Sequence, residues 1–292
     1  MSAAVEFRVG LASCGVANGA RPVHQAVERA VREAGRGTAK AVGCGGMCHR
    51  EPLLEVVEDG RSVLYTRVTP EAVPAIVRRH LRPRRLSTRV RWLADSLRDD
   101  GASREAEGVE AGTGTAPRVV LENCGRLDPS SLDDALALGA YEALRSAAAD
   151  LTPDAVVERI SASGLRGRGG AGFPTGRKWA LARRQPAPRY VIANGDEGDP
   201  GAFMDRLVLE SDPHRVVEGL ALAAFAVGAE EGFFYVRAEY PLAVRRVREA
   251  IRQAEERGLL GEGALGGRLR LRLEVREGAG AARLITKGAV PT

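Results

Sequence analysis

The chain is poor in aromatic side chains and nearly devoid of lysine. Phe, Trp and Tyr make up 4% of the 292 residues, which argues against a base-stacking surface for nucleic acid. Of the 43 basic residues only Lys40, Lys178 and Lys287 are lysines. Because arginines and glutamates are interspersed and the net charge is +5, the charge pattern indicates solubility and an acidic protein partner rather than nucleic acid.

Long apolar runs and a secretion signal are also lacking. The longest apolar run, Val216 to Ala229, is interrupted by Glu218 and is too short to cross a bilayer. No basic-then-apolar leader opens the chain. The four cysteines are too few for the disulfide scaffold of a secreted protein. We therefore expect a cytoplasmic protein with no membrane insertion.

A glycine-rich segment organises the second half of the chain. Six of the thirteen residues from Gly164 to Gly176 are glycine, which lets backbone amides approach a ligand closely. Arg166, Arg168 and Lys178 add positive charge, so the segment is typical of a phosphate-binding loop. Its spacing matches neither a Walker loop nor the dinucleotide fingerprint. Lysine in so arginine-rich a chain indicates a need for a compact ammonium group there.

An acidic loop follows about fifteen residues later. Residues 194–201 read Asn-Gly-Asp-Glu-Gly-Asp-Pro-Gly and come directly after an apolar strand expected at 190–193. In open α/β sheets, ligands bind beyond the carboxyl ends of the strands. Such a turn alone is typically a solvated loop or a helix cap, but its pairing with the basic glycine loop favours a binding site.

The pattern of apolar residues predicts two α/β domains. In the first we expect strands at 5–12, 39–43, 52–57 and 62–68, with helices at 20–34 and from Thr69-Pro70 to Leu81. Glu58-Asp-Gly-Arg61 predicts the turn of a hairpin. In the second we expect strands at 119–121, 190–193, 232–238 and 269–275, and helices at 131–148, 153–164, 215–227 and 241–257. Alternating strands and helices predict a mostly parallel, covered sheet.

Four motifs carry a family resemblance. The segments GRGGAGFPTG-x-KW, NGDEGDPGAFMDR, ESDPH and YVRAEYP resemble the NADH-oxidising flavoprotein subunit of respiratory complex I and of NAD-linked hydrogenases and formate dehydrogenases. The resemblance implies an α/β fold with a thioredoxin-like N-terminal domain and a Rossmann-like FMN-binding domain. The implied boundaries are a ferredoxin-type domain at 1–82, a linker at 83–117, in which Trp92 lies in an expected short helix, and a partial FMN/NADH-binding domain at 118–281, with an atypical tail at 282–292.

The resemblance also implies roles for the two loops. Residues that would bind FMN through its phosphate, ribityl chain or ring are Gly167, Arg168, Gly169, Gly170, Lys178, Asn194, Asp196, Glu197 and Gly198. Phe173 would stack on the adenine of NADH and Asp199 would lie near the nicotinamide, while Leu181 stands where some members have a second stacking phenylalanine. The implied reaction passes a hydride from NADH to FMN, then single electrons to iron–sulfur centres of partner subunits, with no catalytic acid or base.

The cysteines of the N-terminal domain suggest an incomplete metal site. The segment Gly43-Cys-Gly-Gly-Met-Cys-His-Arg-Glu-Pro52 resembles thioredoxin-like [2Fe–2S] ferredoxins, whose four thiolates are spaced C-x₄-C and C-x₃-C. Cys14, Cys44 and Cys48 match three of them, but the fourth position holds Val9. We therefore expect a degenerate cluster or none, with His24 or His49 as a less favoured nitrogen ligand. Cys124 is expected to be structural.

The C-terminal end departs from the pattern of the family. After Gly278-Ala-Gly-Ala281 the resemblance leads us to expect a Cys-Gly-Glu-Glu-Thr motif and later a [4Fe–4S] motif, and the sequence has neither. Residues 282–292 are consistent with a frame shift, so the FMN domain is expected to be incomplete. An inactive remnant that serves as an anion-binding, FMN-binding or assembly module is therefore an alternative. An RNA contact through Arg166-Gly-Arg-Gly-Gly170 is a third, less favoured interpretation.

Overall fold

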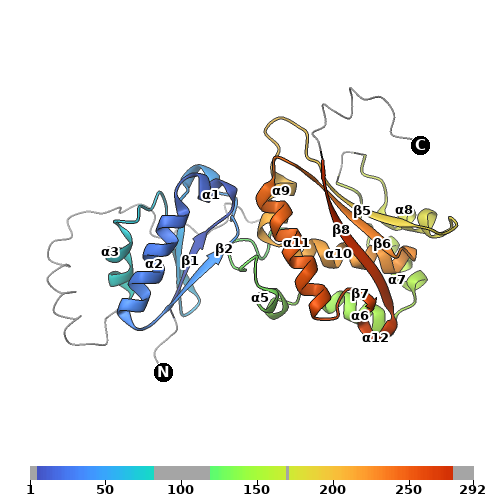
Figure 1. The fold of residues 1–292 in the computed structure, drawn as a ribbon, viewed down its shortest axis with the longest axis horizontal. Coiled ribbons are helices and arrows are strands. Elements are labelled where there is room, and N and C mark those ends of the chain that lie inside the picture. The colour runs from blue at the N-terminus through green and yellow to red at the C-terminus, as the bar shows by residue number, and fades with distance from the viewer. Residues whose placement is uncertain (1–4, 82–118, 169–170, 279–292) are drawn as a thin grey trace. The chain divides into compact units, whose positions relative to one another are not determined.

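The first unit is built on a four-stranded sheet with the order β2-β1-β3-β4. The computed structural model describes residues 5–81, 119–168 and 171–278, and the chain divides into two units at residues 129 and 130 (Figure 1). The elements of the first unit are β1 (Glu6–Gly10), α1 (Ser13–Ala17), α2 (Ala20–Ala34), β2 (Thr38–Val42), a 3₁₀ turn (Cys48–Arg50), β3 (Leu54–Glu58), β4 (Arg61–Tyr65) and α3 (Val73–His80).

The topology of this unit is thioredoxin-like, as predicted. Strands β1 and β2 are parallel and are connected through α2, whereas β3 and β4 form an antiparallel hairpin beside β1. Helix α2 buries Val23, Val27 and Val31 along one stripe. The hairpin turn has positive φ at Asp59 and Gly60, which is the conformation that an Asp-Gly turn favours.

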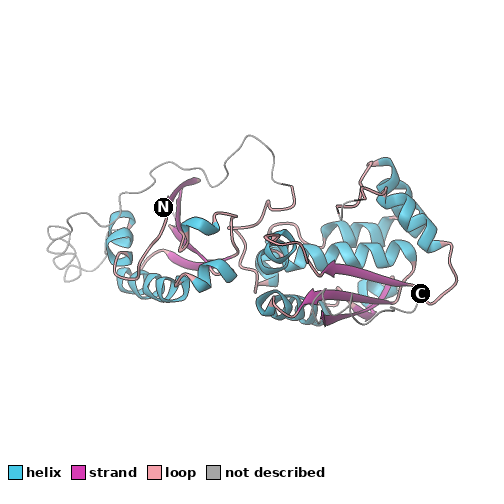
Figure 2. Cartoon of the chain, turned by 90° about the horizontal axis from the view of Figure 1, so that it is seen from above, coloured by secondary structure: helices cyan, strands magenta, loops and turns pink. Residues whose placement is uncertain are grey.

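The second unit holds a mostly parallel sheet with the order β5-β6-β8-β7. Strands β5, β6 and β8 are parallel and the short β7 is antiparallel to β8. Its elements are α5 (Leu132–Ala137), α6 (Glu142–Asp150), α7 (Pro153–Ala162), α8 (Thr175–Arg183), β5 (Tyr190–Gly195), α9 (Met204–Ser211), α10 (Pro213–Val227), β6 (Glu231–Arg237), α11 (Pro241–Glu256), β7 (Gly261–Gly263), α12 (Ala264–Gly267) and β8 (Leu269–Gly278). The α/β class is thus confirmed for both units (Figure 2).

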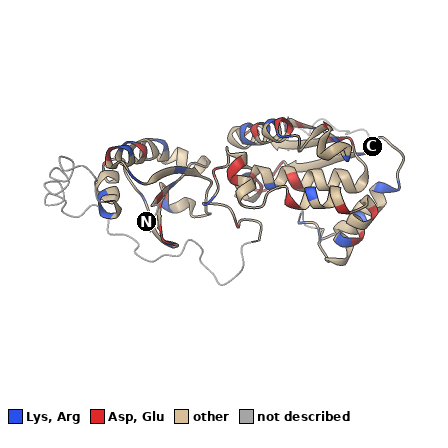
Figure 3. Cartoon of the chain, turned by 90° about the horizontal axis from the view of Figure 1, so that it is seen from below, with Lys and Arg blue, Asp and Glu red and all other residues tan. Residues whose placement is uncertain are grey.

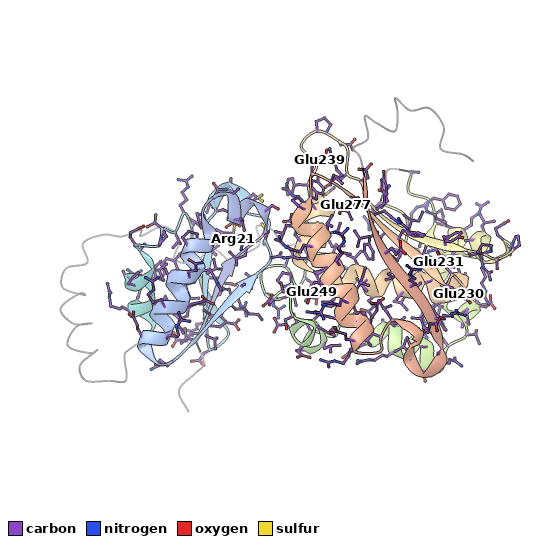
Figure 4. All side chains as sticks on the ribbon, in the orientation of Figure 1. Arg21, Glu230, Glu231, Glu239, Glu249 and Glu277 are labelled. Carbon is purple, nitrogen blue, oxygen red and sulfur yellow. The ribbon has the colours of Figure 1, made fainter. Side chains whose placement is uncertain are left out.

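The helices α10 and α11 cover one face of this sheet. Their buried side chains pack against the inward residues of the strands, such as Phe234, Val236 and Leu271. On the opposite face Tyr190 and Ile192 are exposed. An ion pair of 2.8 Å between Arg248 Nη2 and Glu277 Oε1 also joins α11 to the end of β8, where Figure 4 marks Glu277. Positive and negative side chains are interspersed on both units, as expected from the sequence (Figure 3).

Several predicted elements were wrong. Residues 119–121 form turns, and the side chains of Val119 and Val120 are exposed, so their β propensity is not supported by burial. The helix expected at 131–148 is two helices, because Gly139 and Tyr141 have positive φ between α5 and α6. Helix α3 begins at Val73 rather than at Thr69-Pro70.

The structure also contains helices that the sequence pattern did not predict, and some predicted segments lie outside the described residues. Helices α8 and α9 were not predicted, because each follows a glycine-rich loop and has a short apolar stripe. The linker at 83–117, its short helix around Trp92, and the tail at 282–292 lie outside the described residues. Among the residues that are described, no helix is long and apolar enough to cross a membrane.

Candidate functional site

The glycine loop is closed on itself by backbone hydrogen bonds. Gly167 N–H donates to the carbonyl of Phe173 at 2.9 Å, and Thr175 N–H donates to that of Leu165 at 2.9 Å. The Arg166 Nε–H group donates to the Gly172 carbonyl at 2.7 Å. Gly169 and Gly170, at the tip, lie outside the described residues. The closed loop leads directly into α8.

Two predicted site residues lie beside this loop with exposed side chains. Phe173 is 42% exposed, and the guanidinium of Arg177 lies 5.7 Å from the centre of its ring. Lys178 is exposed on the first turn of α8. An exposed aromatic ring beside cationic side chains can stack on a planar ligand and attract its phosphates. Arg168 is likewise exposed.

Gly176, the last glycine of the loop, serves helix packing. A Cβ at this position would lie 2.2 Å from Ser161 Oγ and 2.6 Å from the Ser161 backbone nitrogen. Helices α7 and α8 therefore approach so closely that only glycine fits between them. The sequence pattern grouped this glycine with the anion-binding ones, and only tertiary contact reveals its different role.

The acidic loop leaves the carboxyl end of β5 with a partly unpaired carboxylate. Asn194 Oδ1 accepts a hydrogen bond from Asp196 N–H at 2.9 Å. Asp196 Oδ1 is buried, and within the described part of the chain it has no hydrogen-bond partner. Gly198 and Asp199 are exposed. Because a buried, unpaired carboxylate oxygen is costly, Asp196 Oδ1 is a candidate acceptor for a polar group of a ligand.

The side chain of Glu197 has a structural role. Its Oε1 accepts hydrogen bonds from Met204 N–H at 2.8 Å and from Asp205 N–H at 3.3 Å, so the carboxylate caps the N-terminus of α9. Tyr240 O–H also donates to Glu197 Oε2 at 3.4 Å, and Arg237 donates to the Glu197 carbonyl. Burial, with the negative charge of Glu197, raises the pKa of Asp205.

A buried polar network lies in the core of the second unit. His214 is fully buried, with its Nδ1 2.9 Å from Tyr141 Oη and its Nε2 3.2 Å from Gln253 Oε1. Gln253 Nε2 in turn donates to the Ser130 carbonyl at 2.9 Å. Burial lowers the pKa of His214 and raises that of Tyr141, so both are neutral at pH 7. The network joins α6, α10 and α11 and contains part of the ESDPH motif.

The polar hollow of this unit is separate from both loops. It has a volume of about 360 Å³ and lies between the start of α5 and the end of α11. Its arginines are paired, Arg257 with Asp133 at 2.7 Å and Arg252 with Glu249 at 2.5 Å; Glu249 is marked in Figure 4. With their charges neutralised, these arginines give no reason to place an anion there.

In the first unit, Cys44 and Cys48 form a close pair of thiols. Their Sγ atoms are 3.7 Å apart, and Gly46 N–H donates to Cys44 Sγ at 3.2 Å. Burial raises the pKa of Cys44, so this thiol is protonated unless a metal ion binds it. Cys14 lies half-buried on α1, and none of the four cysteines forms a disulfide. Val9 is fully buried in the core on β1.

Glu51 is a buried acid beside these thiols that the sequence pattern did not reveal. Its side chain is 6% exposed, Oε2 accepts a hydrogen bond from Leu53 N–H at 2.9 Å, and the Cys44 thiol approaches the carboxyl group. Burial raises the pKa of Glu51 to about 7. The residue type and sequence spacing of Glu51 did not indicate a buried acid, because its burial depends on the fold.

The other candidate ligands of this unit have different surroundings. His24 lies on α2 with its Nδ1 3.9 Å from Glu28, and His49 Nε2 accepts a hydrogen bond from Arg50. Cys124 is buried in the 119–129 segment, where a Cβ on Gly125 would lie 3.8 Å from the Cα of Gly45. In the described ranges, no three His, Cys, Asp or Glu side chains converge on one point as a single-metal site requires.

Residues 160–283 match the family described as the Nuo51 FMN-binding domain. The matched segment includes both the glycine loop and the acidic loop, which bears out the family resemblance of the sequence motifs. One relative is the NADP-reducing hydrogenase subunit HndC of Solidesulfovibrio fructosivorans, 52% identical over 165 residues, or 56% of this chain and 33% of that protein. Another is an NADH-quinone oxidoreductase subunit of Rhizobium meliloti, 47% identical over 164 residues, or 56% of this chain and 39% of that protein.

A solved structure aligns with nearly the whole chain. The NAD⁺-reducing [NiFe]-hydrogenase in its H₂-reduced state aligns with 96% of this chain and 44% of its own, at 24% identity and a TM-score of 0.45. The chain spans between a third and two fifths of the length of the two curated relatives. Both relatives are named as enzyme subunits.

Proposed function

We propose that this chain is an NADH-oxidising flavoprotein subunit, which binds FMN in its second unit and delivers electrons to iron–sulfur centres of partner subunits in the cytoplasm. The observation that carries the proposal is the unpaired, buried Oδ1 of Asp196 in a segment that matches the Nuo51 FMN-binding domain. A hydroxyl group of a ribityl chain would satisfy that oxygen.

The two loops belong to one site in this proposal. Helix α8 begins at the glycine loop and turns back through residues 184–189 into β5, which ends at the acidic loop. Arg189 holds this reversal by donating to the Arg183 carbonyl at 2.5 Å. Because a helix and the strand that follows it run in opposite directions in such α/β units, the start of α8 and the end of β5 share one edge. Gly167, Arg168, Gly169, Gly170 and Lys178 would hold the phosphate there, and Asn194, Asp196 and Gly198 the ribityl chain and ring.

NADH would bind next to this group. The exposed ring of Phe173 offers a stacking surface for the adenine, and Asp199 offers an exposed carboxylate for the nicotinamide end. Bound FMN supplies the ability to accept a hydride and to release electrons singly. The residues of this chain would orient the two rings, and none of them needs to act as an acid or base.

The proposal also includes an iron–sulfur cluster in the first unit. A [2Fe–2S] cluster needs two ligands at each iron. Two thiolates at about 2.3 Å from one tetrahedral ion are about 3.8 Å apart. The distance of 3.7 Å between the Sγ atoms of Cys44 and Cys48 fits one such pair. Cys14 supplies a third thiolate, and Val9, which has no donor atom, cannot supply a fourth.

A second candidate function is an FMN-binding or assembly module without turnover. It is favoured by residues 282–292, which differ from the Cys-Gly-Glu-Glu-Thr motif that the family resemblance leads us to expect there, in the cofactor pocket. This module would bind FMN through the same loops but would not oxidise NADH. The two functions therefore differ in activity, not in FMN content.

FMN binding and turnover can be tested on the full chain. The protein is reconstituted with FMN, and bound flavin and NADH–ferricyanide activity are measured. Asp196→Ala should weaken FMN binding about 10-fold or more, since a hydrogen bond to a charged group contributes about 1.5–3 kcal/mol. Glu255→Gln, an exposed change on α11, is the control and should not alter binding. Flavin without activity would favour the module, and no flavin on folded wild-type protein would contradict both functions.

A further inference from the structure

Glu51 lies between the two segments that carry the candidate thiolate ligands. The Cys44 thiol approaches its carboxyl group from one side. On the other side, a Cβ on Gly10 would lie 3.2 Å from Glu51 Oε1, and a Cβ on Gly15 would lie 3.2 Å from Oε2. Gly10 follows Val9 at the end of β1, and Gly15 follows Cys14 on α1. The carboxyl group is therefore next to the segment in which the fourth thiolate is absent.

One oxygen of Glu51 accepts no hydrogen bond from the described residues. Oε2 accepts the hydrogen bond from Leu53 N–H, whereas Oε1 is buried and has no hydrogen-bond partner among the residues that the structure describes. With only 6% of the residue exposed, water cannot easily satisfy this oxygen. A buried acceptor of this kind requires a cation or a donor as a partner.

The geometry favours a two-metal cluster over a single ion. No three donor side chains converge on one point in the described ranges, which argues against a tetrahedral zinc site. A two-iron cluster instead takes its protein ligands as two separate pairs. Cys44 and Cys48 have the spacing of one pair, and the Glu51 carboxyl group lies next to Gly15, the neighbour of Cys14 in the sequence.

We propose that Glu51 is the fourth protein ligand of a [2Fe–2S] cluster whose other ligands are Cys14, Cys44 and Cys48. Non-thiolate ligands are compatible with such clusters, since two histidines replace two cysteines in Rieske centres. A carboxylate oxygen is also a common ligand of protein-bound iron. This inference rests on the iron–sulfur part of the proposed function and is independent of FMN binding in the second unit.

The experiment compares two substitutions of Glu51 in the full chain. Wild-type protein, Glu51→Ala, Glu51→Cys and the control Glu33→Gln, an exposed change on α2, are reconstituted without oxygen with ferrous iron and sulfide. Bound iron, acid-labile sulfide and FMN are quantified, and the electron paramagnetic resonance spectrum of the reduced cluster is recorded. Far-ultraviolet circular dichroism shows whether each apoprotein is folded.

We expect alanine at position 51 to abolish cluster binding and cysteine at the same position to restore it. Glu51→Ala should lose most of the iron and sulfide, whereas Glu51→Cys should retain them with g values shifted toward those of a four-thiolate cluster. Glu33→Gln should match wild type, and FMN content should be equal in all four proteins. The rescue separates a ligand from a packing residue, because replacing an oxygen ligand by a thiolate shifts the g values toward those of four-thiolate clusters, which a change in packing does not do in a defined direction.

Four outcomes would overturn the inference. These are an unchanged cluster in Glu51→Ala, a Glu51→Cys spectrum identical to that of wild type, loss of the cluster in both variants, and a folded wild-type protein that takes up no iron. Cys124→Ser is measured in parallel, because Cys124 lies on the segment that packs beside Gly45. Cluster loss in Cys124→Ser with retention in Glu51→Ala would assign the fourth position to Cys124. Loss of FMN binding alone would contradict the proposed function and leave Glu51 as a ligand.

Discussion

Gly176 shows at the scale of a single residue how a sequence pattern can group unlike roles. The six glycines from 164 to 176 form one compositional feature, and the pattern correctly predicted a loop there. However, Gly167 belongs to the closed loop, whereas Gly176 lies where α8 touches Ser161 of α7. The sequence cannot distinguish them, because the close approach of α8 to α7 is a tertiary contact that glycine spacing does not reveal.

Gly176→Ala should destabilise the second unit by about 1–3 kcal/mol, the usual cost of an overpacked contact. The new Cβ would collide with the Ser161 backbone, so no rotation of a side chain can relieve it. Gly219→Ala on α10 is the matched control, since a Cβ there meets nothing within 4 Å and alanine favours a helix. Urea unfolding measures both variants. Equal stability of the two would show that the close helix contact is wrong.

The buried His214 predicts a loss of stability in acid. Burial lowers its pKa in the folded protein below the unfolded value of about 6.5, so the unfolded chain binds the proton more readily. This contribution to stability is therefore fully present above about pH 6.5 and is lost as the pH falls toward the lowered folded pKa. The substitution His214→Gln removes this pH-dependent contribution to the free energy of unfolding.

The difference in unfolding free energy between pH 8 and pH 5.5 should consequently be smaller in His214→Gln than in wild type. His80, whose pKa is also lowered by burial, titrates equally in both proteins and cancels in the comparison. Urea unfolding at the two pH values gives the measurement. The same pH dependence in both proteins would show that His214 does not titrate in this range.

At the scale of elements, Glu197 decides where α9 begins. The sequence places Glu197 in a glycine-rich acidic loop, and the family resemblance assigns it to the cofactor. In the structure its carboxylate accepts hydrogen bonds from the first amides of α9. Glu197 lies seven residues before Met204, the first residue of the helix, which is too far for the usual local capping signal, so the sequence pattern missed α9.

Glu197→Ala should cost about 1 kcal/mol of stability through the loss of this cap. Glu262→Ala is the control, because Glu262 is exposed and its surface ion pair with Arg270 contributes little. Thermal or urea unfolding of the apoprotein tests the cap, and FMN titration tests the cofactor role separately. Weaker FMN binding with unchanged stability would favour the cofactor role over the cap.

Elements with strong apolar periodicity were predicted well, and those that depend on tertiary contacts were not. The bounds expected for α2 match the structure, because its valine stripe recurs at the helical period and Gly35 ends it in the left-handed conformation. By contrast, the break before α6 depends on Tyr141, whose positive φ brings its hydroxyl to His214. No local pattern marks that position, since its partner is 73 residues away.

For the candidate sites, the sequence predicted the loops but not the burial and hydrogen bonding of their acidic side chains. Asp196 and Glu197 are neighbours of the same type in one motif. The fold gives the first an unpaired oxygen and makes the second a helix cap. Glu51 was overlooked because burial of an acid depends on the packing of distant segments. Residue type and spacing therefore identify candidates, and burial with hydrogen bonding separates ligands from structural residues.

At the scale of the whole molecule, the two proposed cofactor sites lie in different units. The residues proposed for FMN all come from 167–199, in the second unit, and the candidate cluster ligands all come from 14–51, in the first. Each unit has its own hydrophobic core. A ligand that binds only the folded state stabilises the unit that holds it, by about 2.7 kcal/mol at a hundredfold excess over its Kd.

FMN should therefore slow amide hydrogen exchange in β5, α8 and α10 while exchange in β1, β3 and α2 stays unchanged. Reconstitution with iron and sulfide should have the opposite pattern, protecting β1 and the 43–51 segment. Hydrogen-exchange mass spectrometry of the full chain under each condition resolves the two units, because their peptides differ. If FMN protected the strands of both units equally, the binding of one cofactor would be coupled to the other unit. In that case the two sites would have to be treated as one cooperative system, and the test of Glu51 would have to be made at fixed FMN saturation.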